Sequence, residues 1–403
     1  MIEGASWTLS IVAPIVGWEG FRGLARLEHD VDSVALSVAA SHSPLRAAGS
    51  IPATMRALIK AEPKPGAQLG EVPVPEVGPR DVLIKVRATS ICGTDLHIYS
   101  WDQWAQGRIR PPMVFGHEFA GNVVATGIEA SRIAVGAYVA AESHIACGSC
   151  YECTHGLRHI CRNVQIIGVD RPGAFAQYVA IPEENAWPTS HRFPPEIATI
   201  QEPMGNAVHT TLSTPIAGAN VAIFGAGPIG LFAVPIARAS GAARIVTVEP
   251  SAFRLALARQ MGSDVVIDPK SENVVRRILE ETEGEGADVV LEMSGNPQAI
   301  AQGLSALRFG GHVALLGIPA RPTEVDLADG VIFKGATVHG ISGRRIFETW
   351  YQTRGFLESG MDLSPIITHR MPLEDFAAAF ELVRSGNSGK VVMFPNIEDE
   401  SQA

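Results

Sequence analysis

The chain contains few cysteines, few aromatic residues and no extended run of basic or apolar residues. Its 403 residues include five cysteines, and only 6% are aromatic. No basic run exceeds two residues and the net charge is −10, so neither nucleic acid nor an anionic membrane is expected as a partner. The longest apolar run, residues 221–237, contains three glycines and two prolines. Because a membrane span needs about 20 apolar residues, this run predicts a buried strand, turn and helix.

The first 54 residues show no clear periodicity. The chain begins with MIEG, which lacks the basic segment of a signal peptide, and acidic residues between 19 and 32 argue against a transit peptide. We therefore expect a cytoplasmic protein. Strand-like patterns begin at Met55, so residues 1–54 are predicted to form an N-terminal extension outside the core.

The patterns after Met55 predict an α/β protein with two kinds of domain. From residue 55 to about 205, short apolar runs alternate with Gly and Pro, which predicts a β-rich domain of short strands and turns. In residues 206–342, strand-like runs such as VAIFG and RIVTVEP alternate with helix-like segments. This alternation predicts a doubly wound parallel sheet with helices on both faces. A helix over 376–386 and a final strand follow.

Four of the five cysteines stand close together. Cys147, Cys150, Cys153 and Cys161 form the pattern C-x2-C-x2-C-x7-C. Disulfides are disfavoured because no secretory context is visible. Iron–sulfur clusters also take four cysteines, but the last gap of the ferredoxin pattern is three residues rather than seven. Four thiolates complete a tetrahedral zinc and leave no open position, so this group predicts a structural zinc site.

The fifth cysteine, Cys92, lies 25 residues before the pair His117 and Glu118. An isolated cysteine is more often an inert buried thiol. A thiolate, an imidazole and a carboxylate would leave one coordination position of zinc free, which predicts a catalytic metal site. Thr94 and His97 then form a plausible proton relay, with a hydroxyl near the metal and an imidazole nearer to solvent. Without the metal, they would be an ordinary turn residue and a surface histidine.

The sequence GAGPIG, which begins at Gly225, fits a dinucleotide-binding loop between a predicted strand and a predicted helix. Gly225 would make the tight turn, Gly227 would let the backbone approach a pyrophosphate, and Gly230 would let the helix pack on the strand. Glu249 ends the next strand, where an acid accepts hydrogen bonds from the adenosine ribose and repels a 2′-phosphate. NAD is therefore predicted rather than NADP. Arg254 could accept a phosphate, but we interpret it as flanking the ribose.

Together these features resemble the zinc-containing medium-chain dehydrogenase/reductase family. The resemblance rests on GHE after an isolated cysteine, on the four-cysteine segment and on the dinucleotide-binding unit after a β-rich domain. It runs from residue 55 to about 395. It implies a GroES-like catalytic domain over 55–205 and 343–397, with a Rossmann domain over 206–342 inserted between them. It also implies a homotetramer, which is usual in the family, with a small-molecule substrate.

The resemblance assigns further site residues. It implies that Glu202 either approaches the zinc or serves the proton relay formed by Thr94 and His97. Besides the loop glycines, the expected NAD contacts are Ile229, Glu249, Arg254, Leu316, Gly317, Ile318, Ile341 and Ser342.

The stretches WDQW, FETWY and LSPIITHR resemble a branch of the family that oxidises L-threonine at its β-carbon with NAD. Oxidation of a polyol or vicinal diol by the same chemistry is the alternative, and a non-catalytic metal- or nucleotide-binding relative is a third reading. The chain departs from the family pattern where Ser342 replaces an aromatic residue and Arg345 replaces an acid. His144 and the region of Arg344 are candidates for binding the amino and carboxylate groups of the substrate, although His144 could equally be a turn residue.

Overall fold

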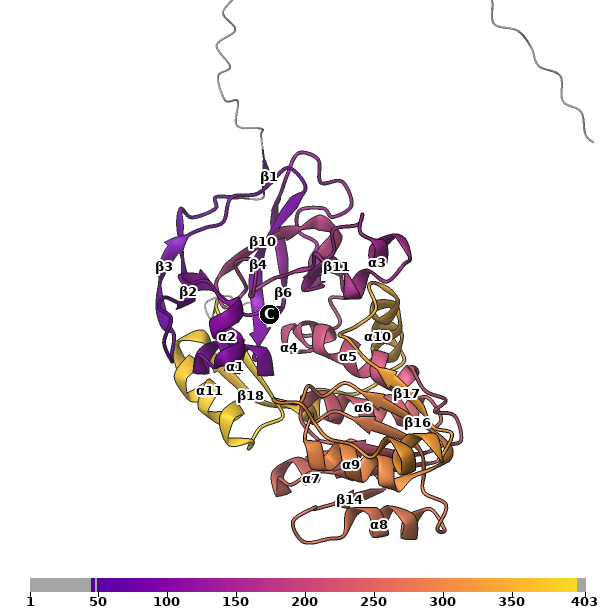
Figure 1. The fold of residues 1–403 in the computed structure, drawn as a ribbon. Helices are drawn as coiled ribbons and strands as arrows, with labels where there is room; N and C mark the ends of the chain where they lie inside the picture. Colours follow the sequence, from indigo (N-terminus) through magenta and orange to yellow (C-terminus); the bar gives the residue numbers. More distant parts are fainter. Residues whose placement is uncertain (1–44, 48, 397–403) are drawn as a thin grey trace, which may run out of the picture. The chain divides into compact units, whose positions relative to one another are not determined.

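A computed structural model of the chain describes residues 45–47 and 49–396 (Figure 1). Its largest sheet has eight strands, which come from the N-terminal and the C-terminal segments of this part of the chain. These strands are β1 Arg46–Ala47, β4 Asp81–Ser90, β6 Glu118–Thr126, β7 Tyr138–Ala141, β10 Tyr178–Pro182, β11 Ala186–Pro188, β18 Ile367–Pro372 and β19 Lys390–Phe394. Strand β19 pairs with β4 through Val392 and Ser90, so the C-terminal segment completes the sheet that the first half of the chain begins.

Outside the parallel sheet of the middle of the chain, the structure also contains two smaller sheets and several short helices. The smaller sheets contain β2 Thr54–Lys60, β3 Gln68–Pro73 and β5 Met113–Val114, and β8 His144–Ile145 and β9 Gln165–Ile166. The helices are α1 Gly93–Ser100, α2 Gln103–Arg108, α3 Tyr151–Thr154, α4 Pro195–Thr199, α10 Glu348–Glu358 and α11 Phe376–Ser385, with short turns η1 Arg158–Ile160, η2 Glu183–Asn185, η4 Ser364–Ile366 and η5 Leu373–Asp375.

The middle of the chain forms a six-stranded parallel sheet in the order β14-β13-β12-β15-β16-β17. Its strands are β12 Asn220–Phe224, β13 Arg244–Val248, β14 Val265–Ile267, β15 Ala287–Glu292, β16 Leu307–Leu315 and β17 Thr337–Gly340. Its helices are α5 Gln201–Leu212, α6 Pro228–Ala239, α7 Ala252–Gln260, α8 Val274–Glu281, α9 Pro297–Ala306 and the turn η3 Ala328–Ile332. This topology confirms the predicted doubly wound α/β sheet.

Apolar side chains on both faces of the parallel sheet explain why helices cover each face. On β12, Val221 and Ile223 pack with the helix residue Leu231, whereas Ala222 and Phe224 point to the other face and pack with Ile300. Successive residues of a strand point to opposite faces, so a strand that is apolar at every position is buried on both sides. The strand order changes direction between β12 and β15. Ligands of such sheets bind outside the carboxyl ends of the strands at this point.

The structure differs from the sequence prediction in three places. The region predicted as strands and turns also contains α1 to α4, which are too short to give a clear helical period. Helix α5 spans Gln201–Leu212 and crosses the domain boundary expected at 205/206. Within the predicted extension, Arg46 pairs with Thr126 of β6, and β2 begins at Thr54, so residues 46, 47 and 54 belong to sheets. Residues 1–44 lie outside the described part.

Among the described residues, no helix combines the length and the apolar content that crossing a membrane requires.

Candidate active site and zinc centres

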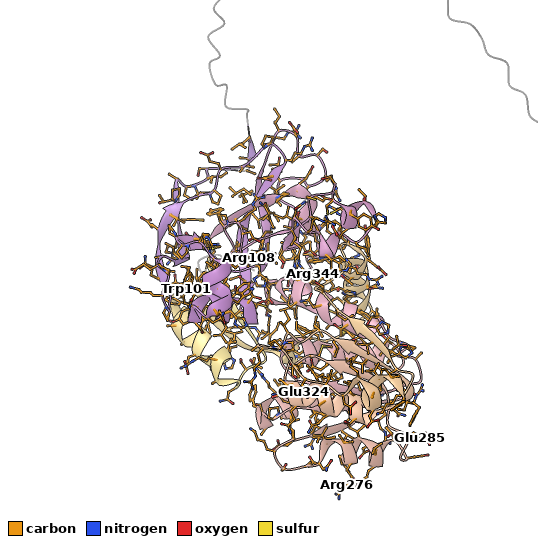
Figure 2. The ribbon with its side chains drawn as sticks, in the orientation of Figure 1. Trp101, Arg108, Arg276, Glu285, Glu324 and Arg344 are labelled. Carbon is orange, nitrogen blue, oxygen red and sulfur yellow. The ribbon has the colours of Figure 1, made fainter. Side chains whose placement is uncertain are left out.

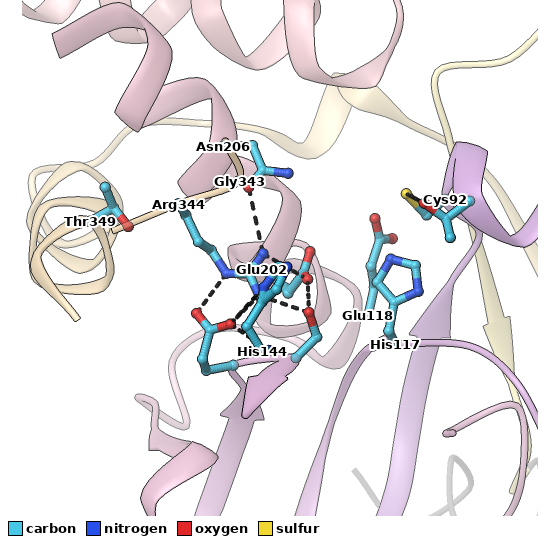
Figure 3. A network of polar contacts seen from close by, with 12 residues as sticks. Cys92, His117, Glu118, His144, Glu202, Asn206, Gly343, Arg344 and Thr349 are labelled. Atoms are coloured by element: carbon cyan, nitrogen blue, oxygen red, sulfur yellow. Dashed lines mark hydrogen bonds and ion pairs between the residues drawn. The ribbon is translucent and has the colours of Figure 1, made fainter. Parts of the chain in front are cut away.

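Cys92, His117 and Glu118 converge at one end of the largest sheet. Each offers one ligand atom, and these atoms lie within 4.8 Å of one another (Figure 3). Cys92 precedes α1, and Glu118 is the first residue of β6, where it pairs with Ser90. One carboxylate oxygen of Glu118, Oε1, is buried and has no hydrogen-bond partner. A thiolate, an imidazole and an unpaired carboxylate oxygen at this spacing suit a zinc ion with an open position.

Asp95 supports two of these groups, although the sequence analysis did not identify it. Its Oδ2 accepts a hydrogen bond from the Cys92 backbone N–H (2.9 Å), and its Oδ1 lies 3.5 Å from His117 Nδ1. Such a carboxylate orients a metal-binding histidine so that its other nitrogen faces the metal. Burial would lower the pKa of His117, but the negative charges of Asp95 and Cys92 outweigh it and raise that pKa. One sequence signal could have identified Asp95, because an acid three residues after the N-cap of a helix often bonds back to that residue, which here is Cys92.

The other oxygen of Glu118 is held by residues from neighbouring strands. Ser90 Oγ donates to Oε2, and Lys390 Nζ forms an ion pair with it. Lys390 is 2% exposed, so this is a buried pair. Burial raises the pKa of the Glu118 carboxyl, and the Lys390 ammonium opposes that effect. Neither Ser90 nor Lys390 was predicted, because only the pairing of β4, β6 and β19 brings them to Glu118.

Glu202 lies in a separate buried network rather than in the three-residue group. Its Oε1 accepts a hydrogen bond from Ser143 Oγ (2.6 Å) and lies 2.8 Å from Arg344 Nη1 (Figure 3). Glu202 also acts electrostatically on Glu118, where its negative charge raises the pKa. Glu202 is therefore near the metal group, and Arg344 and Ser143 hold its Oε1, so a direct role as ligand would fall to its other oxygen, Oε2.

Arg344 is not available to bind a substrate carboxylate, contrary to the sequence interpretation. Its side chain is 1% exposed and forms ion pairs with both Glu142 and Glu202. Figure 2 labels both Arg344, which is buried, and Arg276, which is an exposed side chain of α8. The sequence could not show this because Glu142 and Glu202 are distant in the chain. His144 remains a candidate, since its side chain is 21% exposed.

Thr94 and His97 both lie on α1, as a relay from the metal group requires. Thr94 Oγ1 is 3.9 Å from Cys92 Sγ, and His97 is exposed at 59%. His97 Nδ1 contacts Asp102 Oδ2 at 2.5 Å, a partner that the sequence analysis missed. Burial opposes a low pKa for Asp102, but hydrogen bonds from Ala105 N–H and His97 lower it. Along α1, the Thr94 hydroxyl is therefore nearer to the metal group and the His97 imidazole nearer to solvent, as a proton path to solvent requires.

The four remaining cysteines form a second cluster, whose Sγ atoms lie within 4.8 Å of one another. The Cys161–Cys147 and Cys150–Cys161 separations are 3.5 Å and 3.6 Å. All four thiols are free of disulfides. A tetrahedral zinc with Zn–S bonds of about 2.3 Å places its thiolates about 3.8 Å apart. The geometry therefore fits a closed zinc site.

The GAGPIG loop connects β12 to α6 with the geometry of a dinucleotide site. Gly225 has φ +95°, which favours glycine, and a Cβ at Gly230 would lie 1.9 Å from the Gly225 carbonyl oxygen. Gly227 has open space around its Cα, and Pro228 begins the helix. The backbone can therefore approach a pyrophosphate at the N-terminus of α6.

Glu249 lies beside a cavity of about 390 Å³ at the carboxyl ends of β12 and β13. Its Oε2 accepts from the Ala226 N–H (2.8 Å), and its Oε1 accepts from the Ser251 N–H (3.0 Å). Arg254 is half-buried and donates through Nε to the Ser388 carbonyl (3.1 Å). The cavity thus presents a carboxylate, while Arg254 links α7 to the segment before β19.

The other expected NAD contacts are spread around the same edge of the parallel sheet. Ile229 is in the first turn of α6 and packs against the core. The remaining five follow the carboxyl ends of β16 and β17: Leu316, Gly317, Ile318, Ile341 and Ser342. Ile318 is 90% exposed, so it is open to contact from a ligand.

Comparison with known proteins identifies the family. The alcohol dehydrogenase GroES-like domain matches residues 78–191, and the zinc-binding dehydrogenase model matches residues 228–359. An L-threonine 3-dehydrogenase from Symbiobacterium thermophilum is 53% identical over 347 residues, covering 86% of this chain and 99% of that protein. The chain belongs to the L-threonine 3-dehydrogenase family of zinc-binding dehydrogenases. This confirms the resemblance inferred from the motifs.

Solved structures of other dehydrogenases share the fold of this chain. A zinc-binding dehydrogenase from Sinorhizobium meliloti 1021 bound to NADP has a TM-score of 0.79 and 30% identity, covering 85% of this chain and all of the other. A 2R,3R-butanediol dehydrogenase from Bacillus subtilis has a TM-score of 0.76 and 28% identity, with the same coverage. Because a diol dehydrogenase shares the fold, the fold alone does not separate amino-acid from diol oxidation.

Proposed function

We propose that this chain oxidises the secondary hydroxyl of L-threonine to give 2-amino-3-oxobutyrate, with NAD as the hydride acceptor. The convergence of Cys92, His117 and Glu118 into a group that fits an open zinc site carries the proposal. The relatives named L-threonine 3-dehydrogenase support the substrate. When bound, zinc lowers the pKa of the substrate hydroxyl and nicotinamide accepts the hydride.

The residues of the chain would bind, orient and move the proton. Asp95 faces His117 Nδ1 at 3.5 Å and would orient the ring, while Ser90 and Lys390 leave one oxygen of Glu118 free. Thr94 Oγ1 would accept the proton of the substrate hydroxyl and release its own proton towards His97, which lies on the same helix. Asp102 contacts the His97 imidazole, which is exposed and can release the proton to solvent.

A substrate panel tests the proposal. With NAD present, NADH formation is followed for L-threonine, sorbitol and 2,3-butanediol at matched concentrations. We expect L-threonine to have the highest kcat/KM. Rapid oxidation of sorbitol or butanediol without oxidation of millimolar threonine would be consistent with the proposed dehydrogenase chemistry but would show that L-threonine is not the substrate.

Thr94→Val should reduce kcat by about 10²–10⁴-fold, because general acid–base groups typically contribute that much. Valine keeps the shape of threonine but removes the hydroxyl near Cys92 Sγ. Elemental analysis should find the zinc content unchanged, which separates loss of the relay from loss of the metal. An unchanged kcat would show that the proton leaves by another path.

Glu249→Gln should narrow the preference for NAD over NADP, measured as the ratio of their kcat/KM values. The amide removes the negative charge that repels a 2′-phosphate but keeps the side-chain size and one acceptor for the backbone N–H groups of Ala226 and Ser251. Glu249→Ser removes both acceptors and should weaken NAD further. A native preference for NADP would contradict the assignment of Glu249 to the ribose.

Two zinc ions per chain, a homotetramer and a cytoplasmic location complete the proposal. The zinc count is supported by the two groups of ligand atoms. Elemental analysis and sedimentation of the purified protein test the first two statements. The tetramer rests on the family resemblance and the location on the N-terminal sequence, and both stay predictions.

A further inference from the structure

We propose that Glu142 fixes the tautomer of His144, so that the ring presents Nε2 to the substrate as a hydrogen-bond acceptor. Glu142 acts here as a positioning residue, because it lies behind the ring and does not face the reacting atoms. The inference deepens the proposed function and rests on it only for the identity of the substrate.

Arg344 limits which hydrogen bonds His144 can make. A guanidinium has five N–H donors and no acceptor. Nε donates to Glu142 Oε2 (2.7 Å), and Nη2 donates to Glu142 Oε1 and to Ser143 Oγ (2.8 Å). Nη1 pairs with Glu202 Oε1 (2.8 Å) and donates to Asn206 Oδ1 (3.5 Å). Each nitrogen of Arg344 therefore has an oxygen partner other than His144.

Glu142 is the remaining partner for His144 Nδ1. This nitrogen lies 3.1 Å from Arg344 Nη2 and 3.1 Å from Glu142 Oε1. Burial would raise the pKa of Glu142, but the Arg344 charge and hydrogen bonds from His144 and Trp350 lower it to about 2. The ionised carboxylate only accepts hydrogen bonds. In the neutral ring, Nδ1 therefore carries the hydrogen and donates it to Glu142, which leaves a lone pair on Nε2.

Nε2 lies on the open edge of the ring. Glu142 and Arg344, which face Nδ1, are buried, whereas the His144 side chain is 21% exposed. Within residues 49–396, Nε2 has no recorded hydrogen-bond partner and is not among the buried unpaired atoms. Gly343 borders this edge, since a Cβ there would lie at ordinary van der Waals distance, 3.6 Å from Cε1 and 3.9 Å from Nε2.

The chemistry of this edge favours a cationic donor over an anion. A lone pair on Nε2 accepts a hydrogen bond, and two carboxylates, Glu142 and Glu202, lie in the same network. The guanidinium of Arg344 in that network is already paired with both acids. The ammonium group of an amino acid fits this environment, whereas a carboxylate would meet a lone pair and like charge.

The unmodified enzyme gives the first test. Protein labelled with ¹⁵N in its histidine rings is examined by NMR in a buffer alkaline enough to keep an ordinary imidazole neutral. The His144 signals are identified by their loss in His144→Gln. We expect Nδ1 to show the shift of a protonated nitrogen and Nε2 that of an unprotonated one. Any other assignment overturns the proposal, and this test needs no variant of Glu142.

Glu142→Gln gives the second test, because its amide can donate to Nδ1 and reverse the tautomer. KM for L-threonine should rise about tenfold or more, as expected for losing a hydrogen bond to a charged group, with a smaller change in kcat. KM for 2,3-butanediol, which has no ammonium, should stay close to its original value. Equal increases in KM for both substrates would show that Glu142 has only a structural role and would overturn the proposal.

Trp350→Phe is the matched control. It removes a different donor to Glu142, the indole N–H that bonds Oε2 (2.6 Å), and leaves the groups at His144 in place. The tautomer should persist in this variant, and its reversal would contradict the role of Glu142. If the unmodified enzyme oxidises the diol but not threonine, the proposed function fails, while the nitrogen spectrum still decides the tautomer.

Discussion

Cys92→Ser should abolish dehydrogenase activity and remove one zinc ion per chain. The serine hydroxyl is a far weaker zinc ligand than a thiolate, and the site has only two other ligands in the three-residue group, His117 and Glu118. The zinc contributes several kcal/mol of charge stabilisation to the reaction, so its loss cannot be offset by the relay. Zinc content by elemental analysis and NADH formation should fall together.

Cys147→Ser provides the contrasting control. Cys147 belongs to the four-cysteine cluster, whose metal would contribute to folding rather than to the reaction. This variant should also lose one zinc ion, but its main defect should be a lower unfolding temperature, with the remaining folded protein still active. If Cys92→Ser kept its activity, or lost no zinc, the catalytic role of the three-residue group would be rejected.

Arg344→Met should lower the free energy of unfolding by about 3–5 kcal/mol, the typical cost of removing one partner from a buried ion pair. Methionine fills part of the space but leaves the carboxylates of Glu142 and Glu202 buried without their cation. Denaturant unfolding measures the change. A loss below about 1 kcal/mol would show that water or another cation replaces the guanidinium.

The pH dependence of this variant follows from Glu142. In the native chain its pKa is lowered from 4.5 to about 2, so the stabilisation is present above about pH 4.5 and is lost as pH falls towards 2. In Arg344→Met the buried carboxyl would instead have a raised pKa and take up a proton at higher pH. The difference in stability should therefore be largest near neutral pH and shrink on acidification.

Arg345→Met is the matched control for the loss of positive charge. Arg345 is 52% exposed and pairs with Glu348 at 3.2 Å on the surface. Exposed pairs contribute little, so the free energy of unfolding should change by no more than about 0.5 kcal/mol. A loss comparable to that of Arg344→Met would show that net charge, rather than the buried pairing, causes the effect.

The sequence was sufficient to predict the parallel sheet and to single out the two groups of residues that the fold brings together, because each prediction rests on spacing along the chain. The four cysteines lie within 15 residues, and the helices and strands around GAGPIG have clear apolar patterns. The supporting residues could not be found in this way. The role of Asp95 depends on α1, which places its carboxylate near His117. Lys390 reaches Glu118 only through the pairing of β19 with β4. The mistaken role for Arg344 has the same origin, since its carboxylate partners come from distant segments.

The buried pair of Glu118 and Lys390 also has a consequence for synthesis of the protein on the ribosome. Glu118 is made long before Lys390, and at about 5–20 residues per second the delay amounts to tens of seconds. Throughout that interval the nascent chain holds Cys92, His117 and Glu118 without the cation and the strand that complete their surroundings. The catalytic site therefore reaches its final form only when the last strand of the described chain has emerged and joined the sheet.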